Sequence, residues 1–184
     1  MASETKADRA VVAAADQFIR YGFARTTMGD IARAAEMSRP ALYLLFPGKE
    51  ELFEAAVLHL NRIRMAEIRS ALGKAHNLAG QLYIACDLWL VEVFDLQLRT
   101  PDARDMDDLS IPVVRRVYQE LEREIASLID KNAAETPMAS SQHLARGLVF
   151  AVRGYGAAAD NVDDFRAMAK LQVELLCKAL ASTA

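Results

Sequence analysis

The amino-acid sequence predicts an all-α protein, with a small N-terminal three-helix domain followed by a larger helical bundle domain, about nine helices in all. Two observations support this fold class. The 184 residues are rich in the helix formers Ala, Leu, Glu and Arg, with only 8 Gly and 5 Pro, and no long stretch alternates with the period of two typical of strands. Hydrophobic residues make up 53% of the chain and charged residues 26%, as expected for a packed globular protein.

The first helix is predicted at about residues 7–21, where apolar residues such as Phe18 recur at the spacing of one helix face. Gly22 is expected to end this helix. Glycine adopts a left-handed backbone after a helix at little cost, and the apolar Phe23 can then fold back onto the last turn.

A second, short helix is predicted to start at Thr27 and to end near Ala35. Thr27 and Asp30 have the spacing of a capping box, in which a hydroxyl and a carboxylate satisfy two backbone N–H groups at a helix start. A tight turn at Glu36 and Met37 then separates this helix from the next one.

A third helix is predicted to start after Ser38, a favourable N-cap residue, with Pro40 in its first turn, where a missing N–H costs little. The Pro47-Gly48 pair ends it. Three short helices with a tight turn before the last one have helix-turn-helix geometry, in which the last helix enters the major groove of DNA. The same arrangement can also be a plain packing element.

The rest of the chain is predicted to form five longer helices, at roughly 49–72, 77–98, 110–131, 139–159 and 162–181. Gly73 and an acidic loop at 101–108 mark two of the breaks between them. We therefore expect a small domain at residues 1–48 and a larger one at 49–184, joined by the helix that starts at residue 49.

Cysteine usage and the N-terminus predict a cytoplasmic protein. Cys86 and Cys177 show no CxxC spacing, and the N-terminus lacks the pattern of a signal sequence. The most apolar stretch, residues 78–98, contains three acidic residues, which would be costly inside a bilayer. No membrane span is expected.

The charges of the chain are unevenly distributed. Its net charge is −3, whereas affinity for nucleic acid comes mainly from Lys and Arg. Between residues 20 and 49, however, the local net charge is +3, from Arg20, Arg25, Arg33, Arg39 and Lys49 against Asp30 and Glu36. The positive charge therefore coincides with the predicted helix-turn-helix.

The residues of this region resemble the DNA-binding signature of the TetR family almost in register, over roughly residues 10–56. The resemblance rests on three segments at fixed offsets: TTMGDIA at 26–32, Met37-Ser38, and ALYLLFPGKEEL at 41–52. It implies a transcriptional regulator, specifically a repressor that is released from its operator by a small-molecule effector. It further implies a homodimer on a pseudo-palindromic operator in double-stranded DNA.

The resemblance also implies which residues contact DNA. Thr27, Tyr43 and Lys49 are similar to family residues that bind backbone phosphates, although Thr27 could be only a helix cap and Lys49 only a solvated charge. Arg39 could donate two hydrogen bonds to guanine, and the apolar residues around it could touch thymine methyl groups. The expected contact set is Thr26, Thr27, Ser38, Arg39, Pro40, Ala41, Tyr43, Leu44 and Lys49.

Two positions depart from the family pattern. Glu36 stands where the family usually has glycine, and a left-handed backbone at a residue other than glycine costs about 1–2 kcal/mol. Ala41 replaces a hydroxyl-bearing residue. The operator sequence therefore cannot be inferred from the resemblance.

Two predicted helices near the C-terminus carry faces that suit dimerisation as a four-helix bundle, which the resemblance favours. One helix has a smooth face of small residues, and the other has an apolar stripe that needs a cover beyond its own core. The expected interface residues are Gly147, Ala151, Gly154, Ala158, Met168, Leu171 and Leu175. Packing within one chain is the alternative.

An effector pocket is expected among the middle helices, where aromatic and apolar residues surround isolated polar groups. The candidate lining is Met65, Tyr83, Cys86, Asp87, Trp89, Leu90, Tyr118, Phe150 and Arg153. Ordinary core packing is the alternative for each of them. Asp87 is the most informative, because an acid among apolar residues needs a partner such as Arg153, a ligand or solvent.

Two other functions compete with regulation. An enzyme is the weaker one, because the three histidines are scattered and no nucleophile–base, phosphate-loop or metal-ligand spacing appears. No catalytic residue, metal or cofactor is expected. The other alternative is a helical protein-interaction module that carries a vestigial helix-turn-helix.

Overall fold

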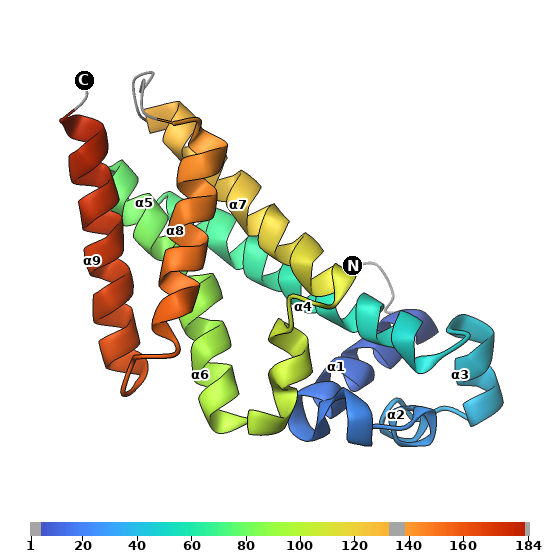
Figure 1. Cartoon of the computed structure of the whole chain (residues 1–184). Helices are drawn as coiled ribbons and strands as arrows, with labels where there is room; N and C mark the ends of the chain where they lie inside the picture. Colours follow the sequence, from blue (N-terminus) through green and yellow to red (C-terminus); the bar gives the residue numbers. More distant parts are fainter. Residues whose placement is uncertain (1–4, 133–138, 183–184) are drawn as a thin grey trace. The chain divides into compact units, whose positions relative to one another are not determined.

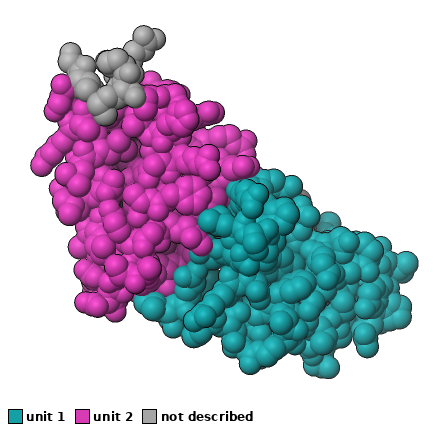
Figure 2. Space-filling view, in the orientation of Figure 1, with its two compact units in different colours: residues 1–63, 96–117 teal, residues 64–95, 118–184 magenta. Residues whose placement is uncertain are grey.

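The computed structural model describes residues 5–132 and 139–182, and all regular structure in these residues is helical (Figure 1). Nine α-helices, one π-helical turn and one 3₁₀ helix follow one another in these ranges, which confirms the all-α fold class. The chain forms two compact units (Figure 2). Unit 1 comprises residues 1–63 and 96–117, and unit 2 comprises residues 64–95 and 118–184.

Unit 1 contains the predicted three-helix region and more. Its elements are α1 (Lys6–Arg25), α2 (Met28–Ala34), α3 (Arg39–Leu45), the first part of α4 (Lys49–Leu72) and the 3₁₀ helix η2 (Pro101–Asp107). The end of α6 (Glu92–Arg99) and the start of α7 (Pro112–Asn132) also belong to it. The loop expected at 101–108 is thus a helical segment, and it packs against α1.

Helix α1 is interrupted at Gly22, as the sequence predicts, although a further turn continues to Arg25. Gly22 has φ 74° and ψ 164°, a backbone that residues with a side chain rarely adopt. Phe23 then packs back onto the preceding helix, with its ring centroid 5.7 Å from that of Phe18 and 5.1 Å from that of Phe53. These three rings form the aromatic part of the unit 1 core.

The two short helices begin and turn as predicted. The Thr27 hydroxyl accepts the amide of Asp30 at 3.2 Å, and the Asp30 carboxylate accepts the amide of Thr27 at 3.1 Å. Ser38 caps α3 by accepting the amide of Ala41 at 3.3 Å. In the turn between the helices Glu36 has φ 53°, so it does take the left-handed backbone that glycine would adopt more cheaply.

Unit 2 is a bundle built from the second part of α4 with the later helices. These are α5 (Leu78–Cys86), the π-helical turn η1 (Asp87–Val91), α6 (Glu92–Arg99), α7 (Pro112–Asn132), α8 (Ser141–Tyr155) and α9 (Val162–Ala181). The single helix expected at 77–98 therefore contains a π-helical turn, and α7 starts two residues after the start expected at residue 110. Helices α5, η1 and α8 pack against α9.

The core of unit 2 is rich in aromatic residues. The Trp89 and Tyr118 rings pack edge to face at 4.6 Å, and the Phe94 and Phe165 rings stack at 4.4 Å. Such pairs add to the apolar area that they bury. Among the residues that the structure describes, none of the helices is both long and apolar enough to cross a bilayer.

Candidate nucleic-acid interface

The outer face of α3 is open to solvent. Arg39, Pro40 and Leu44 are exposed, and Leu44 keeps 88% of its surface accessible although it is a large apolar residue. Leu42 lies on the opposite side of the helix and is fully buried. One face of α3 therefore packs into the core, while the opposite face presents the positive charge of Arg39 beside the apolar Pro40 and Leu44.

Helix α2 helps to place the arginine of this face. A Cβ atom at Gly29 would lie 3.7 Å from both Cδ and Nε of Arg39, which is ordinary van der Waals contact. The arginine stem therefore runs beside the start of α2. On α3 itself, Tyr43 is exposed and Ala41 is half-buried.

Thr27 is exposed at the N-terminus of α2, where it forms a complete capping box with Asp30. Hydrogen bonds from the Thr27 hydroxyl and amide hold the pKa of Asp30 below its ordinary value. The carboxylate therefore stays ionised at neutral pH. Any folding stability that the ionised Asp30 adds is fully present above the pKa that Asp30 has in the unfolded chain. It is lost as the pH falls through the lower pKa that Asp30 has in the folded chain.

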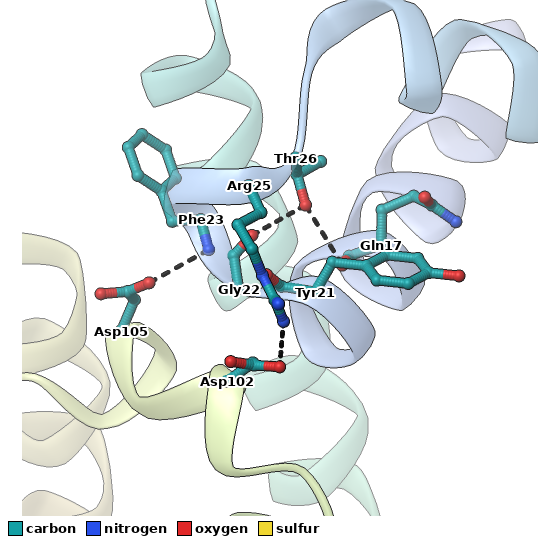
Figure 3. A network of polar contacts seen from close by, with 8 residues as sticks. All are labelled: Gln17, Tyr21, Gly22, Phe23, Arg25, Thr26, Asp102 and Asp105. Atoms are coloured by element: carbon teal, nitrogen blue, oxygen red, sulfur yellow. Dashed lines mark hydrogen bonds and ion pairs between the residues drawn. The ribbon is translucent and has the colours of Figure 1, made fainter.

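Thr26 lies differently from the expectation of a DNA contact. It is only 2% exposed, and its hydroxyl donates to the Gly22 carbonyl at 2.8 Å, with the Gln17 carbonyl 3.2 Å away (Figure 3). The hydroxyl therefore satisfies α1 backbone at the break of that helix. Its burial argues against a direct contact with phosphate, in contrast to the adjacent Thr27.

Lys49, expected to bind a phosphate, also makes contacts within the protein. Its ammonium group donates to the Phe23 carbonyl at 2.7 Å and lies 4.2 Å from the centroid of the Phe23 ring. These contacts hold the start of α4 against the end of α1. They use one of the three N–H donors, so the charge can still act on a nearby anion.

Two acidic residues that the sequence analysis left in a loop belong to the same region. Asp105 of η2 accepts the Phe23 amide at 3.0 Å, and Asp102 pairs with Arg25 (Figure 3). The contacts join residues about 80 positions apart, so no local pattern reveals them. The spacing of three between the two acids, which places them on one side of a helical turn, is the only hint in the sequence.

The residues expected to line an effector pocket are largely core residues of unit 2. Met65, Cys86, Trp89, Leu90 and Tyr118 are buried, whereas Tyr83, Asp87, Phe150 and Arg153 are half-buried. Other described residues line cavities. One of about 310 Å³ lies in unit 2, lined by Gln119, Glu122, Arg123, Gln142, His143 and Arg146. Another of about 350 Å³ lies in unit 1, lined by Phe23, Glu50, Phe53, Glu54, Ile111, Pro112 and Val113.

Asp87 has a partner that the sequence analysis did not identify. Its carboxylate accepts Nε of Arg166 at 2.9 Å, whereas Nε of Arg153 donates to the Tyr118 hydroxyl at 3.0 Å. The contact with Asp87 raises the pKa of Arg166. Burial, with Asp87 nearby, raises the pKa of the Cys86 thiol to about 12, so this thiol stays protonated at neutral pH.

The small-residue face of α8 is open in the single chain. A Cβ atom at Gly147 or Gly154 would meet nothing within 4 Å, and Ala151 is half-buried. Ala158, expected on the same face, lies outside the helix. The amides of Ala158 and Ala159 both donate to the Tyr155 carbonyl, so the chain turns after that residue and the face ends at Gly154.

Helix α9 lies beside α8 (Figure 1) and exposes part of its apolar surface. Leu171 and Leu175 are 57% and 52% exposed, and Met168 is half-buried. Phe165 belongs instead to the buried side of the helix, together with Ala169 and Val173. In the described ranges, no cluster of three or more His, Cys, Asp or Glu side chains could hold a metal ion.

Comparisons with known proteins agree with this arrangement. Residues 10–56, which contain α2, α3 and most of α1, match the family described as bacterial regulatory proteins, tetR family. A solved structure described as a TetR-family transcriptional regulator from Mesorhizobium loti has a TM-score of 0.70 at 22% identity, covering 97% of this chain and 98% of its own.

Two further solved structures have the same fold. A transcriptional regulator from Rhodococcus sp. Rha1 has a TM-score of 0.74 at 18% identity, over 95% of this chain and 97% of its own. The fatty acid degradation regulator FadR from Bacillus halodurans has a TM-score of 0.67 at 14% identity, over 96% of both chains. Residues 10–56 therefore match the DNA-binding region of the tetR family of bacterial regulatory proteins, and the whole chain has the all-helical fold of these solved regulators.

Proposed function

We propose that the chain acts as a homodimeric repressor, which binds a pseudo-palindromic operator through α3 and leaves it when a small-molecule effector binds. The observation that carries the proposal is the exposed face of α3, which presents Arg39, whose stem runs beside the start of α2, together with the 88% exposed Leu44. It acts by binding DNA and not by catalysis.

Arg39 is the residue proposed to read a base. Its guanidinium can donate two parallel hydrogen bonds to O6 and N7 of a guanine, a contact worth about 1–3 kcal/mol of discrimination. Pro40, Ala41 and Leu44 have no side-chain donor or acceptor, so they can contribute only apolar contacts, such as those with thymine methyl groups. Specificity therefore depends on few hydrogen bonds.

Backbone phosphates are the proposed partners of Thr27, Ser38, Tyr43 and Lys49. Thr27 and Ser38 each cap a helix whose first N–H groups favour an anion. Tyr43 offers an exposed hydroxyl on α3, and Lys49 a positive charge at the start of α4. Such contacts fix the position of α3 on the duplex without reading its sequence.

A second copy of the chain is proposed to cover α8 and α9. Gly147, Ala151 and Gly154 give a smooth face where a helix can approach closely, and Leu171 with Leu175 supply apolar area that the single chain leaves in solvent. A two-fold dimer places two recognition helices on half-sites roughly 34 Å apart, which is one turn of DNA.

The effector is proposed to bind among the helices of unit 2. The half-buried polar groups there, Tyr83, Asp87 and Arg153, can orient a ligand among aromatic residues such as Trp89 and Phe150. Release from DNA requires only that the effector and the operator prefer different dimer shapes, with a coupling of about 1–3 kcal/mol.

Selection of bound duplexes from a random pool tests the proposal. We expect the recovered sequences to contain two inverted half-sites, and the logarithm of the binding constant to fall with log salt by about 0.9 per phosphate contact. A reporter gene placed behind such a site should be expressed less when the protein is present. Binding without any sequence enrichment, or no binding at low salt, would overturn the proposal.

A further inference from the structure

The break in α1 leaves backbone groups that an uninterrupted helix would pair internally. At Gly22 the chain departs from helical geometry, so nearby carbonyl and amide groups lose their partners four residues away. Buried or half-buried backbone groups without a partner are costly. The protein satisfies them with side chains, of which Figure 3 shows Arg25, Thr26 and Asp105.

Arg25, in the final turn of α1, and Thr26, directly after it, bind the carbonyl groups at the break. The Thr26 hydroxyl donates to the carbonyl of Gly22 at 2.8 Å, and Nε of Arg25 donates to the carbonyl of Tyr21 at 3.1 Å. These bonds are local, spanning four residues each. They close the last turn of α1 directly before Thr27, where α2 begins.

Two distant segments hold the peptide groups of Phe23. Its amide donates to Oδ2 of Asp105 in η2 at 3.0 Å, and its carbonyl accepts the ammonium of Lys49 in α4 at 2.7 Å. The chain that leads into α2 is therefore fixed from two sides.

The backbone of η2 lies close against the break itself. A Cβ atom at Gly22 would lie 2.5 Å from the carbonyl oxygen of Asp102, a separation that real Cβ atoms do not tolerate. Gly22 has no side chain to obstruct η2, and Asp105, three residues after Asp102, accepts an α1 backbone amide. Together these two features let η2 pack closely against α1. Thr27, the N-cap of α2, lies four residues after Phe23.

We infer that Asp105 is a positioning residue for DNA binding, which holds the Phe23 amide and through it the start of α2 in the geometry that DNA requires. The inference rests on the proposed function. Asp105 does not touch DNA itself; it acts through the chain from Phe23 to Thr27, whose hydroxyl and N-terminal amides lie at the exposed start of α2.

The neighbouring acid Asp102 has a different role. Its carboxylate pairs with Arg25, but the two side chains are 52% and 62% exposed, and exposed ion pairs contribute little. Its close approach to Gly22 is made by the backbone carbonyl, which any side chain at position 102 would keep. Asp102 therefore provides a matched control in the same segment.

Charge and geometry make opposite predictions for the loss of Asp105. Removing a carboxylate makes the protein less negative, which by electrostatics alone strengthens binding to DNA. Losing the acceptor of the Phe23 amide releases residues 23–27, which lead into α2, and so weakens binding to DNA. The sign of the change therefore separates the two effects.

The test compares Asp105→Ala with Asp105→Asn and Asp102→Ala by titration of a selected duplex at one salt concentration. All three variants lose one negative charge, but asparagine keeps an oxygen that can accept the amide. We expect Asp105→Ala to bind DNA roughly tenfold more weakly than the unmodified chain. Asp105→Asn and Asp102→Ala should bind as tightly as the unmodified chain, or slightly more tightly.

Hydrogen exchange of the Phe23 amide, followed by NMR, provides a readout that does not depend on DNA. Exchange should accelerate in Asp105→Ala and stay near the original rate in the other two variants, at a temperature where all are folded. Equal DNA affinity of Asp105→Ala and Asp102→Ala would overturn the inference and leave the proposed function intact. No DNA binding by the unmodified chain would overturn the proposed function, and the inference with it.

Discussion

Replacing Gly22 by Ala is expected to lower the free energy of unfolding by about 2–4 kcal/mol. Two independent causes add up at this position. The backbone at φ 74° and ψ 164° is strained for any residue with a side chain, and the new Cβ would lie 2.5 Å from the Asp102 carbonyl oxygen. Either α1 or η2 must move to relieve the contact.

Urea unfolding followed by circular dichroism measures this effect, and Gly73→Ala provides the control. Gly73 is exposed, and a Cβ atom there would meet nothing within 4 Å, so its replacement should change stability by less than about 1 kcal/mol. A Gly22→Ala variant as stable as Gly73→Ala would contradict the close packing of η2 against α1.

Introducing charge on the exposed apolar stripe of α9 is expected to abolish the proposed dimer. In Leu171→Glu with Leu175→Glu, two carboxylates would have to be buried without partners when a second copy covers the helix. The monomer can engage only one half-site at a time, so affinity for a two-half-site operator should fall by at least about 100-fold.

Sedimentation measures the oligomeric state, and Lys170→Glu is the matched control. Lys170 is exposed beside Leu171, and its replacement by Glu changes the net charge by the same two units as the double variant. We expect the control to stay dimeric. A double variant that still sediments as a dimer would exclude α9 from the interface.

Local patterns predicted the short helices of unit 1 well. Caps at Thr27 and Ser38 and the break at Gly22 all depend on residues within a few positions of one another. Side-chain caps and glycine conformations have local physical causes, so a single sequence is enough to predict them.

Contacts between distant segments could not be predicted in this way. Asp87 and Arg166 are 79 residues apart, and Phe23 and Asp105 are 82 apart. Several basic side chains could have paired with Asp87, and which of them does depends on how the helices pack. The π-helical turn η1 was missed for a related reason, because one wider turn hardly disturbs the apolar periodicity of residues 77–98.

The two adjacent threonines show where local reasoning stops within the site itself. Both Thr26 and Thr27 were expected to contact DNA, yet the Thr26 hydroxyl is buried against α1 and Thr27 is exposed at the start of α2. The difference follows from the extra turn of α1 after Gly22, which rotates Thr26 toward the carbonyls of that helix. Capping rules alone do not reveal that turn.

The reading of DNA by α3 is tested most directly by comparing the sequences that the unmodified chain and Arg39→Ala select from random duplexes. We expect Arg39→Ala to lose the preference for one guanine in each half-site, a change of about 1–3 kcal/mol at that position, while the other positions keep theirs. Tyr43→Phe, as the control, should weaken all sequences alike. An unchanged preference at every position in Arg39→Ala would contradict base reading by this residue.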